Sequence, residues 1–96
     1  IAIDPISNEI NCLGNIEKET TQVLKNLLAV LNAGGAKVED VIKTTIYLTD
    51  LKNFQIVNSI YGEFFKVENP PARACVEVSS LPKGVLIEIE CIAYVD

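Results

Sequence analysis

Three charged residues between Pro70 and Ile92 could carry out chemistry. Arg73 lies in a run of small and β-branched residues, and Glu88 and Glu90 lie in the apolar run that follows it. A charge within a strand of apolar residues is costly unless it is paired or used. A guanidinium is a two-pronged donor that fits a carboxylate, and a glutamate can move a proton to or from a bound water. This segment is therefore the candidate site for holding a small acid and acting on it with water.

The strands that carry these residues are predicted to form a hairpin. The segments 72–78 and 85–95 both have the β-branched composition of strands, and the segment 79–84, which contains proline and glycine, predicts a turn. Strands joined by a short turn usually pair with each other. We therefore expect these two strands to be neighbours in the sheet.

Alternation along the two strands brings the candidate residues together. Successive side chains point to opposite faces, so Arg73 and Cys75 share one face of the first strand, and Glu88 and Glu90 share one face of the second. If the apolar face of each strand turns toward the helices, all four side chains lie on the open face. If Val78 pairs with Val85 across the turn, Cys75 lies opposite Glu88 and Arg73 lies opposite Glu90. Two interpretations follow: a cross-strand ion pair on a solvated sheet, or a ligand site.

The remainder of the chain predicts the scaffold that positions this site. Apolar residues recur at three- and four-residue steps after Asn15, a candidate N-cap, and Gly34 and Gly35 predict the end of that helix. The predicted elements are a strand at 1–3, a helix at 16–33, a strand at 41–48, a helix at 51–66, and strands at 72–78 and 85–95. The fold class is therefore α+β, a single domain with the order βαβαββ, in which two helices cover one face of a mixed sheet.

Composition excludes several kinds of chemistry. The 96 residues carry a net charge of −5 and only eight Lys and Arg, which disfavours nucleic-acid binding. There is no histidine, so Ser-His and Cys-His catalysis and histidine metal ligands are excluded. Three cysteines without a CxxC pair indicate reduced thiols in a cytoplasmic protein. No apolar run reaches the length of a membrane span, and an apolar content of 49% in so small a domain favours a homo-oligomer.

The same segment also carries a family resemblance. The run from Pro71 to Val78 (Pro-Ala-Arg-Ala-Cys-Val-Glu-Val), then Leu81-Pro82, then Ile87-Glu88-Ile89-Glu90, resembles the signature of the RidA family, also called the YjgF family. The likeness continues upstream, in order and spacing, at Gln22, Asn26-Leu27, Gly34-Gly35, Lys43-Thr44-Thr45, Asp50-Leu51, Phe54, Val57-Asn58, Tyr61 and Phe64-Phe65. It covers essentially the whole chain, and the Pro71–Glu90 signature is its specific part.

The resemblance implies a fold, an assembly and an activity. The fold is chorismate-mutase-like α+β, assembled as a homotrimer with sites between subunits. The activity is hydrolysis of reactive 2-enamine and 2-imine acids, such as 2-aminoacrylate and 2-iminopropanoate, to 2-keto acids and ammonia. No cofactor and no metal is required. The family also carries two further strands before the position of Ile1, with a tyrosine and a Ser-Gly-Gln turn that complete the cleft. We expect residues 1–96 to be a single domain of this kind that lacks these N-terminal strands, and a chain without them would lack one wall of the cleft.

The resemblance assigns roles to four residues of this chain. Arg73 matches the arginine that binds the substrate carboxylate, and Glu88 matches the glutamate that positions or activates the attacking water. Cys75 matches a position that lines the site mainly through its backbone N–H, and Asn58 matches an asparagine of the second helix near the cleft. For Asn58 a helix-surface amide remains an alternative, as core packing does for Tyr61.

Two other functions remain open at this stage. One is a non-catalytic trimer that binds small carboxylic acids, which would need Arg73 but not Glu88. The other is a ribonuclease or translation inhibitor, an activity also attached to parts of the RidA family. The acidic net charge and the lack of histidine argue against the last.

Overall fold

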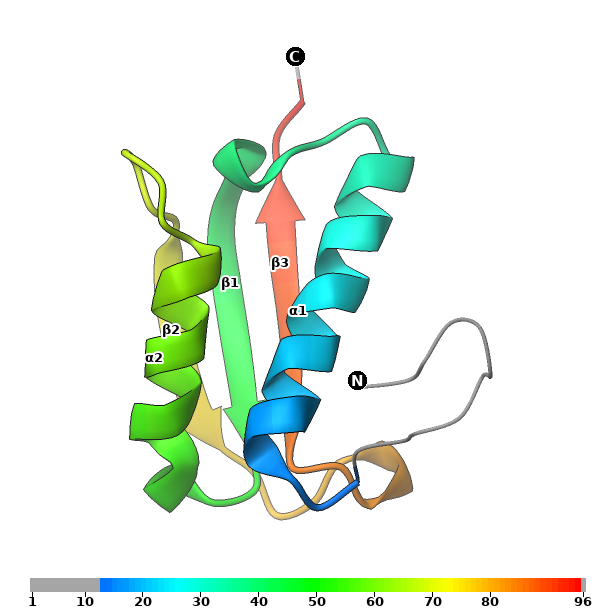
Figure 1. The fold of residues 1–96 in the computed structure, drawn as a ribbon, viewed down its shortest axis with the longest axis vertical. Helices are drawn as coiled ribbons and strands as arrows, with labels where there is room; N and C mark the ends of the chain where they lie inside the picture. Colours follow the sequence, from blue (N-terminus) through cyan, green and yellow to red (C-terminus); the bar gives the residue numbers. More distant parts are fainter. Residues whose placement is uncertain (1–12, 96) are drawn as a thin grey trace.

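The computed structural model describes residues 13–95 and contains two helices packed on one side of a three-stranded sheet (Figure 1). The elements are α1 (Ile16–Ala33), η1 (Val38–Asp40), β1 (Val41–Leu48), η2 (Leu51–Asn53), α2 (Phe54–Phe64), β2 (Ala72–Glu77), η3 (Pro82–Gly84) and β3 (Ile87–Ala93). The α+β class and the two helices agree with the predictions. The predicted strand at 1–3 lies outside the described residues.

The helix ends follow from local sequence. The side chain of Asn15 accepts a hydrogen bond of 3.0 Å from the backbone N–H of Lys18, which caps the first turn of α1. Gly35, at φ +80, takes the left-handed conformation that lets the chain leave that helix at low cost. Asp50 accepts from the backbone N–H of Lys52 at 2.9 Å and so starts the 3₁₀ turn η2 that leads into α2. The second predicted helix is thus a short 3₁₀ turn followed by an α-helix that ends at Phe64.

The order of strands in the sheet is β2-β1-β3, so the predicted hairpin is wrong. Strand β1 lies in the centre, parallel to β2 and antiparallel to β3. The connection from β2 to β3 passes the end of β1: Val78 donates its N–H to Leu48 O at 2.8 Å, and Thr49 donates its N–H to Leu86 O at 3.1 Å. A nine-residue connection (78–86) is long enough to cross one strand, about 10 Å in total. The sequence favoured a tight turn because Pro82 and Gly84 occur there, and these residues instead form η3.

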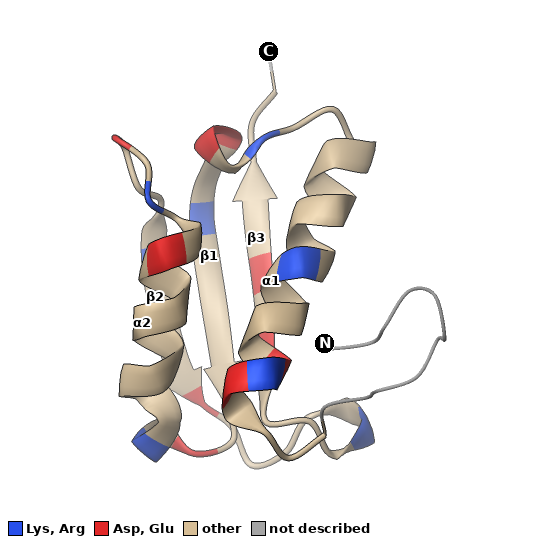
Figure 2. Ribbon diagram, viewed as in Figure 1, with Lys and Arg blue, Asp and Glu red and all other residues tan. Residues whose placement is uncertain are grey.

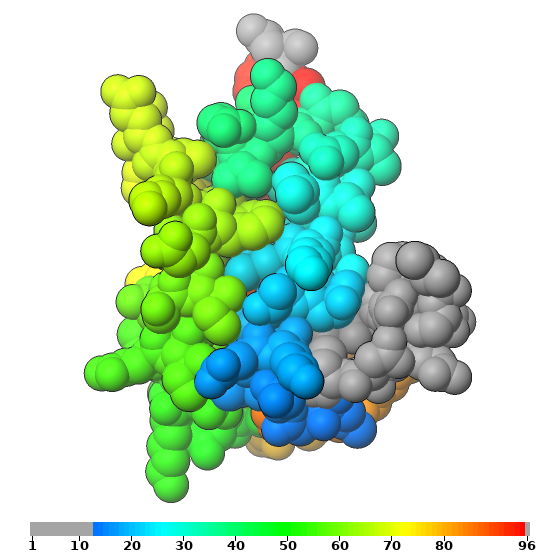
Figure 3. Space-filling view, in the orientation of Figure 1, coloured from blue at the N-terminus to red at the C-terminus, as the bar shows by residue number. Residues whose placement is uncertain are grey.

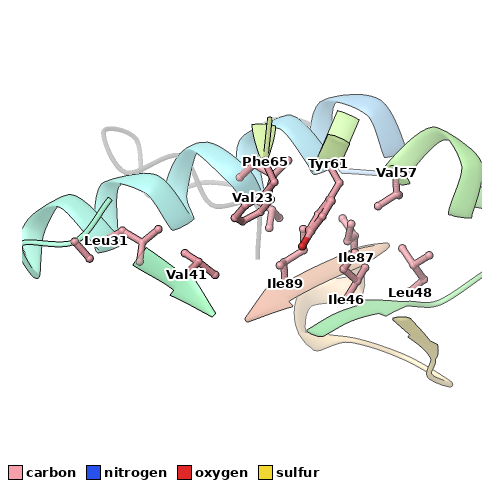
Figure 4. Packing of buried hydrophobic residues seen from close by; sticks show 12 residues of the cluster. Val23, Leu31, Val41, Ile46, Leu48, Val57, Tyr61, Phe65, Ile87 and Ile89 are labelled. Carbon is pink, nitrogen blue, oxygen red and sulfur yellow. The ribbon is translucent and has the colours of Figure 1, made fainter. Parts of the chain in front are cut away.

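The core lies between the sheet and the two helices. Ile46, Leu48 and Ile87 are fully buried beneath Val57 and Tyr61 of α2, and Figure 4 shows their side chains meeting in that layer. In Figure 3 the side chains of α1 and α2 are in contact and close this face of the molecule. The two helices therefore bury one face of the sheet. A functional side chain on that face must extend past the helices to reach solvent.

A buried carboxylate ties α1 to the start of β3. Glu19 is fully buried, and its two carboxylate oxygens accept backbone N–H groups from Gly14 at 2.9 Å and from Leu86 at 2.8 Å. Two charge-assisted hydrogen bonds offset the cost of burying the carboxylate. This contact holds the chain directly before β3 at the N-terminal end of the helix.

The second face of the sheet is not covered by either helix. Directly paired residues point to the same face, so the register assigns to this face Lys43, Thr45 and Tyr47 of β1, Ala72, Ala74 and Val76 of β2, and Glu88, Glu90 and Ile92 of β3. Val76 is 42% exposed and Ile92 57%. Figure 2 shows positive and negative residues mixed along α1, an acidic residue on α2 and acidic residues on β3. Within residues 13–95, neither helix combines the length and the apolar character needed to cross a membrane.

Candidate functional site

Arg73 projects on the helix side of the sheet, opposite to the predicted open face. It is paired in register with Thr44, which is fully buried against the helices. Strand β2 has apolar or small residues on both faces, and Ala72, Ala74 and Val76 occupy the uncovered one. The prediction assumed that the apolar face turns toward the helices. That assumption is correct for β3 and wrong for β2, because the uncovered face is itself apolar.

Three side chains of α2 surround the guanidinium of Arg73. Its Nη1 donates to Oδ1 of Asn58, and its Cζ lies 5.6 Å from the ring centroid of Phe54 and 5.1 Å from that of Tyr61. These residues occupy positions i, i+4 and i+7 of the helix, which fall on one stripe. Cation–π contacts at such distances favour a fixed guanidinium. The exposed side chain of Arg73 is thus held in place at the edge strand β2.

No carboxylate of residues 13–95 pairs with Arg73, so the cross-strand ion pair is not formed. Two glutamates of the predicted hairpin are engaged with other groups: Glu90 accepts from the Tyr47 hydroxyl at 2.8 Å, and Glu77 accepts from the N–H of Leu51 at 2.9 Å. Arg73 therefore carries a positive charge whose remaining donors are available to a ligand.

Glu88 lies on the uncovered face, away from Arg73. Its register partner on β1 is Tyr47, whereas the register partner of Arg73 is Thr44 on the other face. Strand β1 also separates β2 from β3. The prediction that Arg73, Cys75, Glu88 and Glu90 share one face is therefore wrong within a single chain: the first two lie on the helix side and the two glutamates on the other.

The thiols near the site are neutral at physiological pH. Burial raises the pKa of Cys75 above its ordinary value, and the nearby Arg73 lowers it by a smaller amount. Burial also raises the pKa of Cys91. Since the thiolate is the nucleophilic form, neither cysteine is prepared for covalent catalysis. Cys75 can contribute through its backbone, because every second N–H of an edge strand points away from its neighbour.

Tyr61 joins the guanidinium to the core, a role that the sequence did not reveal. Its hydroxyl and that of Thr44 share a buried hydrogen bond of 2.6 Å. Burial raises the pKa of Tyr61, while the hydrogen bond from Thr44 and the charge of Arg73 act to lower it. The spacing of Phe54, Asn58 and Tyr61 was the available signal, and it could be read only once α2 was known to lie beside β2.

Two hollows occur elsewhere on the described surface. One of about 410 Å³ lies between the start of α1 and α2 and is lined by Glu17, Ile56 and Ile60 among others. The other, of about 230 Å³, lies over β1 and β3 beside Glu90. Neither includes Arg73. Residues 13–95 contain no cluster of three or more Cys, Asp or Glu side chains placed to hold a metal ion.

Comparison with known proteins identifies the family. A family model described as endoribonuclease L-PSP matches residues 1–95. The chain belongs to this family, which includes the RidA (YjgF) proteins. The chain is 53% identical over 94 residues to a RutC family protein of Pyrococcus horikoshii, covering 98% of this chain and 73% of the relative.

Two other relatives in the family have names that state a reaction. The human 2-iminobutanoate/2-iminopropanoate deaminase is 44% identical over 93 residues, which cover 97% of this chain and 66% of that protein. The Salmonella typhimurium protein of the same name is 43% identical over 95 residues, covering 97% and 73%.

Solved structures support the same fold. A Rid family protein from Yersinia pestis superposes with a TM-score of 0.95 at 48% identity, covering 99% of this chain and 75% of the other. Escherichia coli TdcF, solved with bound serine, superposes with a TM-score of 0.91 at 37% identity, covering 100% and 76%. The chain thus spans about three quarters of the length of these family members, and its α+β fold is theirs.

Proposed function

We propose that this protein hydrolyses 2-enamine and 2-imine acids to 2-keto acids and ammonia. The observation that carries the proposal is Arg73, an exposed guanidinium held by Asn58, Phe54 and Tyr61 without a carboxylate partner among residues 13–95. Such a group is suited to bind the carboxylate of a small acid. Two relatives at 43–44% identity are named 2-iminobutanoate/2-iminopropanoate deaminase, and serine, the molecule bound to TdcF, is a small carboxylic acid.

In this proposal, Arg73 holds the substrate and Glu88 directs the water. The fork of the guanidinium binds the carboxylate, and the backbone N–H of Cys75 assists, with Asn58 keeping the guanidinium oriented. Water adds to the imine carbon after losing a proton to Glu88, and that proton passes to the nitrogen. The product of this addition is a carbinolamine. Its hydroxyl proton then moves to the amino group, and the C–N bond breaks as the C=O bond forms, which releases ammonia and leaves the 2-keto acid. Imine hydrolysis is intrinsically easy, so orientation of substrate and water supplies much of what is needed.

In this proposal Arg73 and Glu88 of one site come from two different chains. Because they lie on opposite faces of one sheet with β1 between them, a small substrate held by Arg73 cannot reach Glu88 of the same chain. A Glu88 from a neighbouring copy supplies the missing carboxylate. The apolar residues on the uncovered face, among them Val76 and Ile92, support association with further copies. A homotrimer with sites between subunits satisfies both observations.

The direct test is a coupled reaction with a threonine dehydratase, which releases the imine of 2-ketobutyrate. Adding the protein should speed formation of 2-ketobutyrate from the imine, and Arg73→Ala should remove the gain. Tyr94→Leu, which removes an exposed aromatic side chain at another position, is the control and should keep the gain. If the protein in its full-length form leaves the rate of imine hydrolysis unchanged, the proposal is wrong.

A carboxylate-binding protein without catalysis is the second candidate, since Arg73 alone would satisfy it. Glu88→Gln separates the two functions. If the variant still binds 2-ketobutyrate but has lost turnover, the protein is an enzyme. If the unmodified protein binds the keto acid and shows no turnover, it is a binder.

Ribonuclease activity, which the description of the family model names, is the third candidate. The net charge of −5 and the absence of histidine disfavour it. RNA cleavage that survives both Arg73→Ala and further purification would point to a contaminating nuclease, whereas cleavage abolished by Arg73→Ala would favour the ribonuclease function.

A further inference from the structure

The cation of the candidate site rests on a buried aromatic ring. Tyr61 is only 6% exposed, and its ring centroid lies 5.1 Å from Cζ of Arg73. Phe54, at 5.6 Å, is the second ring in contact with the guanidinium, and it is only partly buried. Tyr61 is therefore the contact of Arg73 that belongs to the rigid core.

The ring of Tyr61 is held at both ends. Its hydroxyl shares a hydrogen bond of 2.6 Å with Thr44, a residue that is fully buried. Its face packs against Phe65, with ring centroids 4.6 Å apart. Figure 4 shows the Tyr61 oxygen pointing down from α2 toward the sheet, with Phe65 beside the ring. A ring restrained in this way cannot swing out from beneath a cation without breaking a buried hydrogen bond.

Thr44 and Arg73 are direct partners in the parallel ladder of β1 and β2. The hydroxyl that fixes Tyr61 and the backbone that carries the guanidinium are thus neighbours on the same face. Tyr61 extends from α2 and contacts the hydroxyl of Thr44 and the guanidinium of Arg73. The three residues connect the central strand, the edge strand and α2 at the place where the guanidinium leaves the core.

We propose that Tyr61, anchored by Thr44, is a positioning residue that holds the Arg73 guanidinium in the orientation that binds the carboxylate of a small 2-keto or 2-imino acid. The inference rests on the proposed carboxylate site. A guanidinium lying against a fixed ring loses less freedom when it binds a carboxylate, because its fork is already oriented. In this proposal the ring acts on the ligand through Arg73, whose guanidinium it contacts.

The test compares four variants by binding of 2-ketobutyrate, measured by calorimetry. Tyr61→Leu removes the ring, and its Kd should rise about three- to tenfold. Tyr61→Phe and Thr44→Val each remove the hydrogen bond but keep the ring, and each should raise the Kd about twofold. Thr44→Ser keeps the hydroxyl and should therefore keep the Kd of the unmodified protein. In turnover assays, Tyr61→Leu should raise KM by the same factor as Kd with kcat nearly unchanged, as expected for lost uniform binding.

A second readout does not depend on the ligand. Arg73 is the single arginine of the sequence, so its side-chain NMR signals can be assigned without ambiguity. Two aromatic rings within 6 Å should shift these signals upfield in the free protein. Tyr61→Leu should move them toward random-coil values, whereas Tyr94→Leu, which removes an exposed tyrosine, should not.

The outcomes separate the two proposals. If Tyr61→Leu is folded by circular dichroism and binds 2-ketobutyrate as tightly as the unmodified protein, the positioning role is wrong while the carboxylate site stands. If the unmodified protein binds neither 2-ketobutyrate nor other small keto acids, the proposed function fails first, and the positioning role fails with it.

Discussion

A mixture of two inactive variants should recover activity if Arg73 and Glu88 of different chains form one site. Arg73→Ala removes the proposed carboxylate anchor, and Glu88→Gln removes the group proposed to take a proton from water. Each variant alone should be inactive. The two residues lie on opposite faces of the sheet, on strands separated by β1, a spacing of about 10 Å between strand axes. One chain therefore cannot supply both groups to one small substrate.

The expected recovery follows from counting. In trimers assembled at random from equal amounts of the two variants, a site is intact when its Arg73 comes from a Glu88→Gln chain and its Glu88 comes from an Arg73→Ala chain. Each condition holds half of the time, so about one quarter of the sites regain both groups. If both residues came from the same chain, no site would be intact.

The assay is imine hydrolysis coupled to a threonine dehydratase, with the two variants co-expressed or refolded together. Variants folded separately and mixed without subunit exchange are the first control and should stay inactive. The second control mixes the unmodified chain with the double variant in equal amounts. It should retain about one quarter of full activity for a two-chain site and about one half for a one-chain site. Background activity in the co-assembled single variants, together with one half in the second control, would refute the reasoning.

Three further outcomes are expected. Arg73→Lys keeps the charge but loses the fork and the stacking on two rings, so the Kd for 2-ketobutyrate in calorimetry should rise at least about tenfold; unchanged affinity would argue against two-pronged binding. Glu19→Ala leaves the N–H of Leu86 unpaired and should lower the free energy of unfolding in urea by about 2 kcal/mol. The exposed Glu17→Ala should cost less than about 1 kcal/mol, and equal losses would contradict the role of the buried carboxylate. Burial raises the pKa of Cys75 above the ordinary 9.0, so its alkylation by iodoacetamide should accelerate only at a higher pH than that of a free thiol. Peptide mass spectrometry would measure the rate of alkylation. Fast alkylation of Cys75 at pH 8 would contradict this prediction.

The sequence predicted the elements well because their signals are local. The helix that begins after Asn15 has its cap, its apolar stripe and its terminal glycines within the same twenty or so residues, and the structure places α1 at Ile16–Ala33 as expected. Strand β1 likewise matches its β-branched run at Val41–Leu48. Local propensity and periodicity were sufficient for these boundaries.

The pairing of strands was not local, and the prediction failed there. The choice between a hairpin and a strand inserted between β2 and β3 depends on packing of the whole sheet. Nothing in the segment 78–86 distinguishes a turn from a crossing. The face of Arg73 depended on the same information, because β2 is apolar enough to present either side to the helices. The contacts of Arg73 with Asn58 and Tyr61 could therefore be found only in three dimensions.

The central position of β1 also has a consequence for how the chain folds. Its antiparallel neighbour β3 is the last strand described, and Ile87 and Ile89 of that strand complete the core beneath α1. Until β3 has been synthesised, one edge of β1 lacks this partner, and apolar side chains such as Ile46 lack part of their cover. During translation the earlier elements must remain incompletely packed, exposed to proteases and to pairing with other chains. Folding of this domain is therefore expected to wait until β3 has left the ribosome.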